Sequence, residues 1–162
     1  FEFGLFAMID GVPFAADQTY TTLWSAESFT FSGSDFATED NPAEWTIGLS
    51  FAQDEIMEDT YPLGPQTSFD EIYACNSFLA NEFYCGLLSV TVINTNPDVG
   101  RVDYINQIQA PNYERPITIT FEEATFERGG IISGTFSGEA GNVNDGTDFV
   151  NVTEGRFRIR FD

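Results

Sequence analysis

Apolar residues recur at every second position in several stretches of this chain, and no other feature constrains the fold as much. Within residues 44–51, one polar or small residue separates each large apolar residue from the next, and residues 28–32 and 117–122 repeat the pattern. A period of two is typical of antiparallel strands with one face in a core and one in water. It predicts an all-β fold, with a single antiparallel β-sandwich domain of about nine to ten strands over residues 1–162.

Turn-forming dipeptides and tripeptides separate the predicted strands. They are Asp10-Gly11, Ser32-Gly33, Gly129-Gly130 and Asn144-Asp145-Gly146. Residues 94–100 and 106–116, which are rich in Asn, Gln and Pro, are predicted to be exposed loops.

The last predicted strand changes its alternation at a glycine. Val150 and Val152 occupy even positions, whereas Phe157 and Ile159, after Gly155, occupy odd ones. A shift of one residue at a glycine predicts a β-bulge. The shift gathers three arginines on the solvent face: Arg156, Arg158 and Arg160. We expect this row to form cross-strand ion pairs with acids such as Glu122 or Glu127. The alternative is that it binds an anionic ligand.

The charge composition excludes several kinds of chemistry. The chain has 26 acidic residues and six arginines but no lysine and no histidine, which gives a net charge of −20. A histidine base, a lysine nucleophile and a phosphate-loop lysine are therefore absent, and we expect no enzyme activity. A carboxylate pair would need a deep cleft, which a sandwich of this size rarely provides. The charge also repels nucleic acid, and it would keep an exported or salt-adapted protein soluble.

The two cysteines, Cys75 and Cys85, lie ten positions apart. In an exported protein they predict a disulfide across a local hairpin, and the alternative is two buried thiols in a reducing compartment. A short helix over residues 69–80 also fits, because Ser68 and Glu71 resemble a capping box, but strand-like flanks favour the hairpin. Two cysteines without a histidine do not make a zinc site.

Two groups of oxygen-bearing side chains are candidate ligands for a metal ion. The first comprises Asp54, Glu55, Glu58 and Asp59, and the second comprises Asn142, Asn144, Asp145 and Asp148. Calcium binds six to eight oxygens of this kind, although neither group has the spacing of an EF-hand loop. With acids so abundant, solvated turns are the simpler interpretation, and we expect no cofactor unless calcium binds here.

Aromatic residues outside the predicted core are candidates for a partner-binding surface. The start of the chain is apolar on both strand faces, with Phe1, Phe3 and Leu5 on one side and Phe6 on the other, so this strand lies inside the fold or pairs with a neighbouring subunit. Aromatic side chains also anchor protein partners or stack on sugars. The candidates of this second kind are Trp24, Tyr104 and Tyr113.

Five segments together resemble a known family. They are AMIDGVPFAA at 7–16, DTYPLG at 59–64, ITITFEEA at 117–124, ISGTFSG at 132–138 and VNVTEGRFRIRF at 150–161. Their order resembles small exported lipoproteins of unknown function from the Bacteroides–Flavobacterium group. The resemblance implies an all-β domain at the cell surface, a lipid anchor on the precursor and no catalytic residues to transfer.

These patterns predict a non-catalytic, exported module at the cell surface or beyond it. No run of 18 apolar residues occurs, so we expect no membrane span. The first hypothesis is assembly with protein partners or with itself. The second is the binding of a small ligand or a glycan.

Overall fold

The computed structural model describes residues 3–25, 28–40, 42–52, 67–72, 85–106, 117–124 and 128–160. These residues form eleven β-strands and no helix, which confirms the all-β prediction. The strands up to the middle of the chain are β1 (Gly4–Ile9), β2 (Val12–Ala15), β3 (Gln18–Ser25), β4 (Ser28–Asp35), β5 (Ala43–Ala52) and β6 (Thr67–Ile72). The remaining strands are β7 (Cys85–Asn94), β8 (Arg101–Ile105), β9 (Ile117–Ala124), β10 (Ile131–Asn142) and β11 (Asp145–Arg160).

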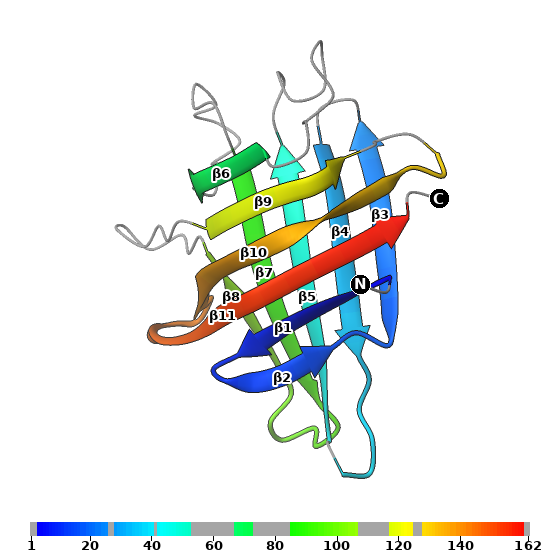
Figure 1. The fold of residues 1–162 in the computed structure, drawn as a ribbon. Coiled ribbons are helices and arrows are strands. Elements are labelled where there is room, and N and C mark those ends of the chain that lie inside the picture. Colours follow the sequence, from blue (N-terminus) through cyan, green and yellow to red (C-terminus); the bar gives the residue numbers. More distant parts are fainter. Residues whose placement is uncertain are drawn as a thin grey trace.

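The described strands belong to one hydrogen-bonded antiparallel sheet, so the predicted sandwich of two separate sheets is not confirmed. The order along the sheet is β2-β1-β11-β10-β8-β7-β5-β4-β3, with β9 and β6 extending from β10. The sheet curls on itself. Figure 1 shows the strands from β6 to β2 crossing in front of the strands from β8 to β3. We call these groups the front half and the rear half.

Strand β10 joins the two halves because it is long enough to pair with both. Its residues Ile132–Gly138 pair with β9, and its last two residues pair with β8. In that second contact Gly141 lies opposite Ile105, and Asn142 lies opposite Tyr104. The alternation that suggested two sheets is therefore satisfied by one sheet that folds over its own core.

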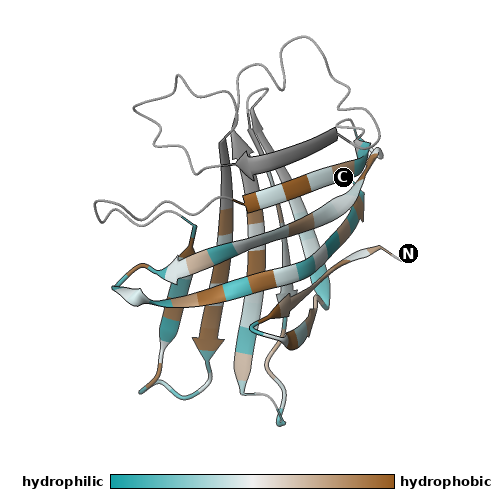
Figure 2. Ribbon diagram, turned by 60° about the vertical axis from the view of Figure 1, so that its left-hand side comes forward, coloured by the Kyte–Doolittle hydropathy of each residue, from teal (hydrophilic) through white to brown (hydrophobic). Residues whose placement is uncertain are grey.

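The core lies between the two halves, and the strands alternate as the sequence predicts. Figure 2 shows brown and pale or teal residues following one another along the strands. The ring of Phe157 in β11 packs against those of Phe121 and Phe136, with centroid distances of 5.9 and 6.2 Å. Ile47 and Leu49 of β5 are fully buried in the rear half.

The predicted β-bulge in the last strand is confirmed. Phe136 pairs with Gly155, whereas Gly138 pairs with Val152, so one residue of β10 faces two residues of β11. Glu154, inside the bulge, has a φ of 51°, in the left-handed region. The bulge lets Val152 and Phe157 point into the same core although their positions differ in parity.

The predicted turns have mixed outcomes. Asp10 and Gly11 form the β1–β2 turn, with φ values of 48° and 79°. Ser32-Gly33 is not a turn, because both residues lie inside β4. A Cβ on Gly33 would lie 2.6 Å from the Cβ of Ala16 and 3.2 Å from that of Leu5. Gly33 is therefore needed for close approach of the two halves rather than for a reversal of the chain.

The predicted hairpin around the cysteines is not formed by the strands that flank it. Strand β6 pairs with β9, whereas β7 pairs with β5 and β8. Cys85 begins β7 and lies opposite Ala52, and Cys75 is outside the described residues. The disulfide stays a prediction. Residues 69–72 belong to a strand, which excludes a helix over that part of 69–80.

One residue of a predicted loop is part of the core. The segment after β7 does form a turn, with Gly100 at a φ of 66°, but Asn106 is completely buried. The Oδ1 atom of Asn106 accepts a hydrogen bond of 3.0 Å from the Leu88 amide, and its own amide donates to the Leu88 carbonyl at 3.1 Å. Asn106 thus continues the β7–β8 pairing beyond the end of β8.

Candidate binding site at the open edge of the sheet

The two ends of the strand order, β2 and β3, are joined by a short corner. The amide of Ala16 donates to the Leu5 carbonyl of the front half at 2.9 Å. The next amide, that of Asp17, donates to the Ser34 carbonyl of the rear half at 2.8 Å. After this corner β3 pairs with β4 and with no other strand in the described part of the chain. Among the described strands, the far side of β3 is therefore an open sheet edge.

A pocket of about 430 Å³ lies beside this edge, where β3 faces the start of β1 and the end of β11. We call it the edge pocket. Its lining combines aromatic, hydroxyl and guanidinium groups, from Phe3, Thr19, Tyr20, Thr21, Arg158, Ile159 and Arg160. Ile159 is buried, whereas Phe3 is 50% exposed and Tyr20 is 53% exposed. The pocket thus reaches from the core to the surface, and it presents two large aromatic side chains to solvent.

The ring of Phe3 lies near the guanidinium groups of both arginines of the edge pocket. The guanidinium carbons of Arg158 and Arg160 each lie 5.2 Å from the centroid of the Phe3 ring. The strand register explains this contact, because Gly4 lies opposite Arg158 and so places Phe3 beside the end of β11. Cation–π contacts of this kind hold a guanidinium in position without neutralising its charge.

Arg158 also forms a cross-strand ion pair, although not with either residue named from the sequence. Its Nε atom lies 3.4 Å from Oε2 of Glu123. Ser133 lies between them in register and donates a hydrogen bond of 3.0 Å to the same carboxylate oxygen. A bulge explains the difference, because Ser133 pairs with Glu123 and Gly134 with Phe121, so Glu122 is the extra residue. Glu127 lies outside the described residues.

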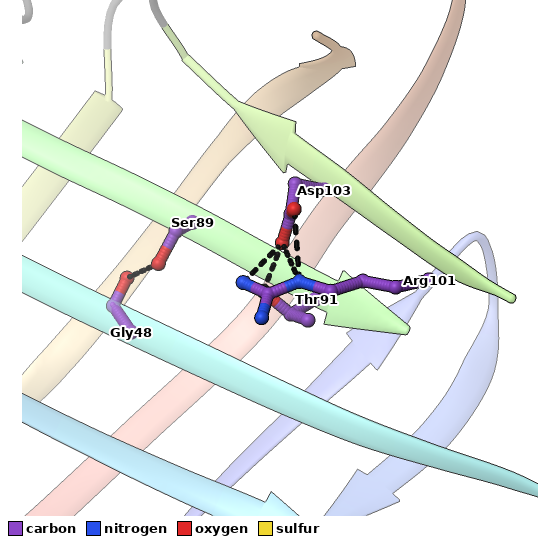
Figure 3. Close-up of polar contacts among 5 residues, drawn as sticks. All are labelled: Gly48, Ser89, Thr91, Arg101 and Asp103. Atoms are coloured by element: carbon purple, nitrogen blue, oxygen red, sulfur yellow. Dashed lines mark hydrogen bonds and ion pairs between the residues drawn. The ribbon is translucent and has the colours of Figure 1, made fainter. Parts of the chain in front are cut away.

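Arg160 differs from the paired arginines. Within the described residues it forms no ion pair, and the same holds for Arg156 and Arg128. Arg101 shows the contrasting case in Figure 3, where its guanidinium reaches Asp103 at 2.9 Å and Thr91 also donates to that carboxylate. The hydrogen bond from Arg101 lowers the pKa of Asp103. The guanidinium of Arg160 thus lies beside the edge pocket and forms no ion pair with the described part of the sheet.

The other aromatic candidates are scattered. Leu5, named with them, is fully buried in the core, so it is not part of a partner surface in the folded chain. Phe6 is half-buried, and its ring covers Gly4, where a Cβ would lie 2.8 Å from the ring. Trp24 belongs to β3, but its side chain is outside the described part, as are Phe1 and Tyr113.

Tyr104 lies away from the edge pocket, in a hydrogen-bonded group with candidate calcium ligands. Its hydroxyl donates to Oδ2 of Asp148 at 3.0 Å, and Nδ2 of Asn142 donates to the same atom at 2.9 Å. Burial, the hydrogen bond to Asp148 and the charges of Asp148 and Asp10 raise the pKa of Tyr104 to about 12.

Two more side-chain oxygens of the β10–β11 turn accept hydrogen bonds from the protein. Oδ1 of Asn142 accepts from the Asn144 amide, and Oδ1 of Asp145 accepts from the amide and hydroxyl of Thr147. The Thr147 hydrogen bonds lower the pKa of Asp145. Calcium binding at this turn and a solvated turn both stay predictions.

No group of three or more acidic, cysteine or histidine side chains that could hold a metal ion occurs in the described part of the chain. The first candidate group, Asp54, Glu55, Glu58 and Asp59, lies outside that part. The described residues also include no helix with the length and apolar character of a membrane span.

No protein-family model, curated protein or solved structure matches the chain. The resemblance to exported lipoproteins rests on the sequence motifs and stays a prediction.

The sequence identified Phe3 and the arginine row separately but did not bring them together. It did not identify Tyr20, Thr19 or Thr21 as candidates, because their positions match those of an ordinary strand. The signal that was present is the composition of β3, QTYTTLWS, which contains no charged residue, no proline and no glycine.

Proposed function

We propose that this protein is a non-catalytic, exported binding module that captures an extended segment of a protein partner along the open edge of β3. A strand at a sheet edge presents unpaired N–H and C=O groups, and an added strand satisfies them. The edge pocket continues this binding surface toward β11.

A comparison of the three edge strands in the described sheet supports the choice of β3. Natural sheets protect their edges with short strands, prolines or charges. Strand β2 has four residues and contains Pro13, and β6 contains Asp70 and Glu71. Strand β3 has eight residues and none of these protections. The proposal rests on this observation that the edge of β3 lacks such protection.

The charge and composition support a protein partner without catalysis. The net charge of −20 repels nucleic acid. The described lining of the edge pocket has hydroxyl, phenol and guanidinium groups but no carboxylate to act as a general base, and the chain has no histidine. The export of the protein to the cell surface follows from the family resemblance and belongs to the same proposal.

The edge can be tested by amide hydrogen exchange with synthetic peptides of about ten residues, a typical upper strand length. The probe alternates valine and asparagine, and its matched control carries proline at two central positions, where it cannot donate to a ladder. In the free protein we expect β3 amides to exchange faster than those of β5. The continuous probe should protect β3, and the proline control should not.

Two results would contradict the proposal. Slow exchange of β3 in the free protein would show that its edge is already covered. Unchanged exchange at millimolar probe would show that the edge does not accept a strand.

A glycan is the second candidate, favoured by one specific feature of the edge pocket. Exposed Tyr20 lines the edge pocket together with Thr19 and Thr21, and aromatic and hydroxyl groups together suit a sugar ring. Neutral sugars would then shift the NMR signals of Tyr20 without protecting β3 amides. Unchanged Tyr20 signals on titration with glucose and related neutral sugars would remove this candidate.

A further inference from the structure

We propose that a second pocket, on the outer face of the front half, binds a small zwitterion with an ammonium and a carboxylate group, the chemistry of a free amino acid. The pocket lies at the β-bulge of β11 and has a volume of about 310 Å³, and we call it the bulge pocket. It shares no described lining residue with the edge pocket. The inference is therefore independent of strand capture at β3.

The polar side chains that line the bulge pocket point away from the core. Phe136 pairs with Gly155 on one side and with Ile119 on the other, and all three residues are buried. Because side chains alternate along a strand, Thr135 and Ser137 point to the outer face. The ring of Phe136 packs inside, so the described lining offers no aromatic face on which a sugar could stack.

The strand register arranges the polar side chains of the bulge pocket in two rows across the sheet. In the first row, Thr135 of β10 lies opposite Arg156 of β11. In the second row, Ser137 of β10 lies opposite Thr118 of β9 and, because of the bulge, faces Glu154 of β11. The rows are two residues apart, which is about 7 Å along a strand. Each row thus combines hydroxyl groups with one charge, and the two charges have opposite signs.

The two charges of the bulge pocket are not used within the described part of the chain. Glu154 and Arg156 are both exposed on the same face of β11, but no ion pair joins them or links either to another described residue. The hydroxyls of Thr118, Thr135 and Ser137 likewise form no hydrogen bond with described residues. One donor group and one acceptor group of full charge are therefore available to a ligand.

A zwitterion matches both rows at once. Its carboxylate can accept hydrogen bonds from the guanidinium of Arg156 and the hydroxyl of Thr135. Its ammonium can donate to the carboxylate of Glu154 and to the hydroxyl oxygens of Ser137 and Thr118. The net charge of −20 repels a ligand with an excess of negative charge, and a simple cation would leave Arg156 unpaired. A small molecule with one charge of each sign avoids both penalties.

Three small probes test this inference by NMR titration of the full chain at constant ionic strength. Glycine carries both charges, whereas acetate and methylammonium carry one each. We expect glycine to shift the signals of Ser137 and Arg156 and to bind about two- to fivefold more tightly than either other probe, as one additional exposed ion pair allows. This preference should weaken at about 1 M salt, where charges are screened within a few ångströms.

Charge-removing variants of similar size locate the effect. Glu154→Gln and Arg156→Gln should each reduce glycine binding to the level of a probe with one charge. Glu122→Gln and Arg128→Gln make the same charge changes at exposed residues outside the bulge pocket, and they should leave glycine binding intact. Thermal melts of the four variants check that each is folded.

Three results would overturn the inference. Binding of acetate or methylammonium as tight as that of glycine would exclude recognition of both charges. Unchanged signals with all three probes at hundreds of millimolar would exclude the site. Glycine binding that survives in both Glu154→Gln and Arg156→Gln would place the ligand elsewhere. None of these results bears on strand capture, which is measured by the protection of β3 amides.

Discussion

The ring centroids of Phe31 and Phe157 lie 4.5 Å apart, and this contact joins β4 of the rear half to β11 of the front half. Both side chains are almost completely buried. Among the described residues, backbone hydrogen bonds join the two halves at β10 and at the Ala16–Asp17 corner. Between these joins, contacts such as that of Phe31 with Phe157 hold the curled sheet closed.

Replacement of Phe157 by alanine should therefore be severe. Phe157→Ala removes a ring that contacts Phe31, Phe121 and Phe136, and we expect a loss of about 3–5 kcal/mol in the free energy of unfolding. Phe149→Ala in the same strand is the control, because Phe149 is 44% exposed. Chemical denaturation of both variants measures the difference, and similar losses would contradict the assigned core.

Gly155 should tolerate no side chain. A Cβ at this position would lie 2.5 Å from the carbonyl oxygen of Phe136 and 2.7 Å from its ring. We expect Gly155→Ala to cost about 1–3 kcal/mol through overpacking and disruption of the bulge. Gly146→Ala is the matched control, since a Cβ added there would meet no atom within 4 Å and its backbone is not strained. Equal stability of the two variants in thermal melts would refute the bulge geometry.

Asn106 should matter for stability although it carries no charge. Asn106→Ala leaves the buried Leu88 amide without the acceptor it now has, and we expect a loss of about 1–3 kcal/mol. Asn96→Ala, which removes a similar side-chain acceptor from an exposed turn, should have a much smaller effect. Urea titrations compare the two. If Asn96→Ala proved the more damaging, the position of Asn106 in the core would be wrong.

Alkaline pH should unfold the protein partly through Tyr104. An unfolded tyrosine has a pKa near 10, whereas burial first, and then Asp148 and Asp10, raise the pKa of Tyr104 to about 12. The unfolded state therefore loses its proton first. The stabilisation from neutral Tyr104 is complete below about pH 10 and is lost as the pH rises to about 12. Spectroscopic titration of the tyrosines should lose a transition near pH 12 in Tyr104→Phe, and an unchanged curve would contradict this assignment.

Calcium should leave the β10–β11 turn unchanged, because one side-chain oxygen of each of Asn142, Asp145 and Asp148 already accepts a hydrogen bond from the protein. We expect the melting temperature to be the same with and without millimolar calcium. A rise that Asp148→Asn abolishes would restore the calcium hypothesis for this turn. A rise that persists in that variant would assign the ion to another group, such as Asp54, Glu55, Glu58 and Asp59.

The sequence predicted those features that depend on near neighbours in the chain. Alternation identified β5 and β9, and the change of parity at Gly155 located the bulge, since each depends on a few consecutive side chains. The dipeptide Asp10-Gly11 identified a turn for the same reason. Ser32-Gly33 has similar composition, but its role depends on Leu5 and Ala16, which no local pattern reveals.

The features that were missed depend on residues far apart in the chain. The pairing of β6 with β9, and the single curled sheet in place of a sandwich, follow from which strands meet. The partner of Arg158 was missed by one residue because the bulge at Glu122 changes the register. The edge pocket combines Phe3, just before β1, with residues 19–21 of β3 and 158–160 at the end of β11. Only the uncharged composition of β3 could have indicated it in advance.

The register that places Gly4 opposite Arg158 also has a consequence for how the protein is made. A chain that leaves the ribosome or a secretion channel from its amino end has β1 ready long before β11 exists. Until β11 is made, β1 can pair only with β2 among the described strands, and its apolar face is exposed to aggregation. Closure of the curled sheet at β1 therefore waits until β11 has been made.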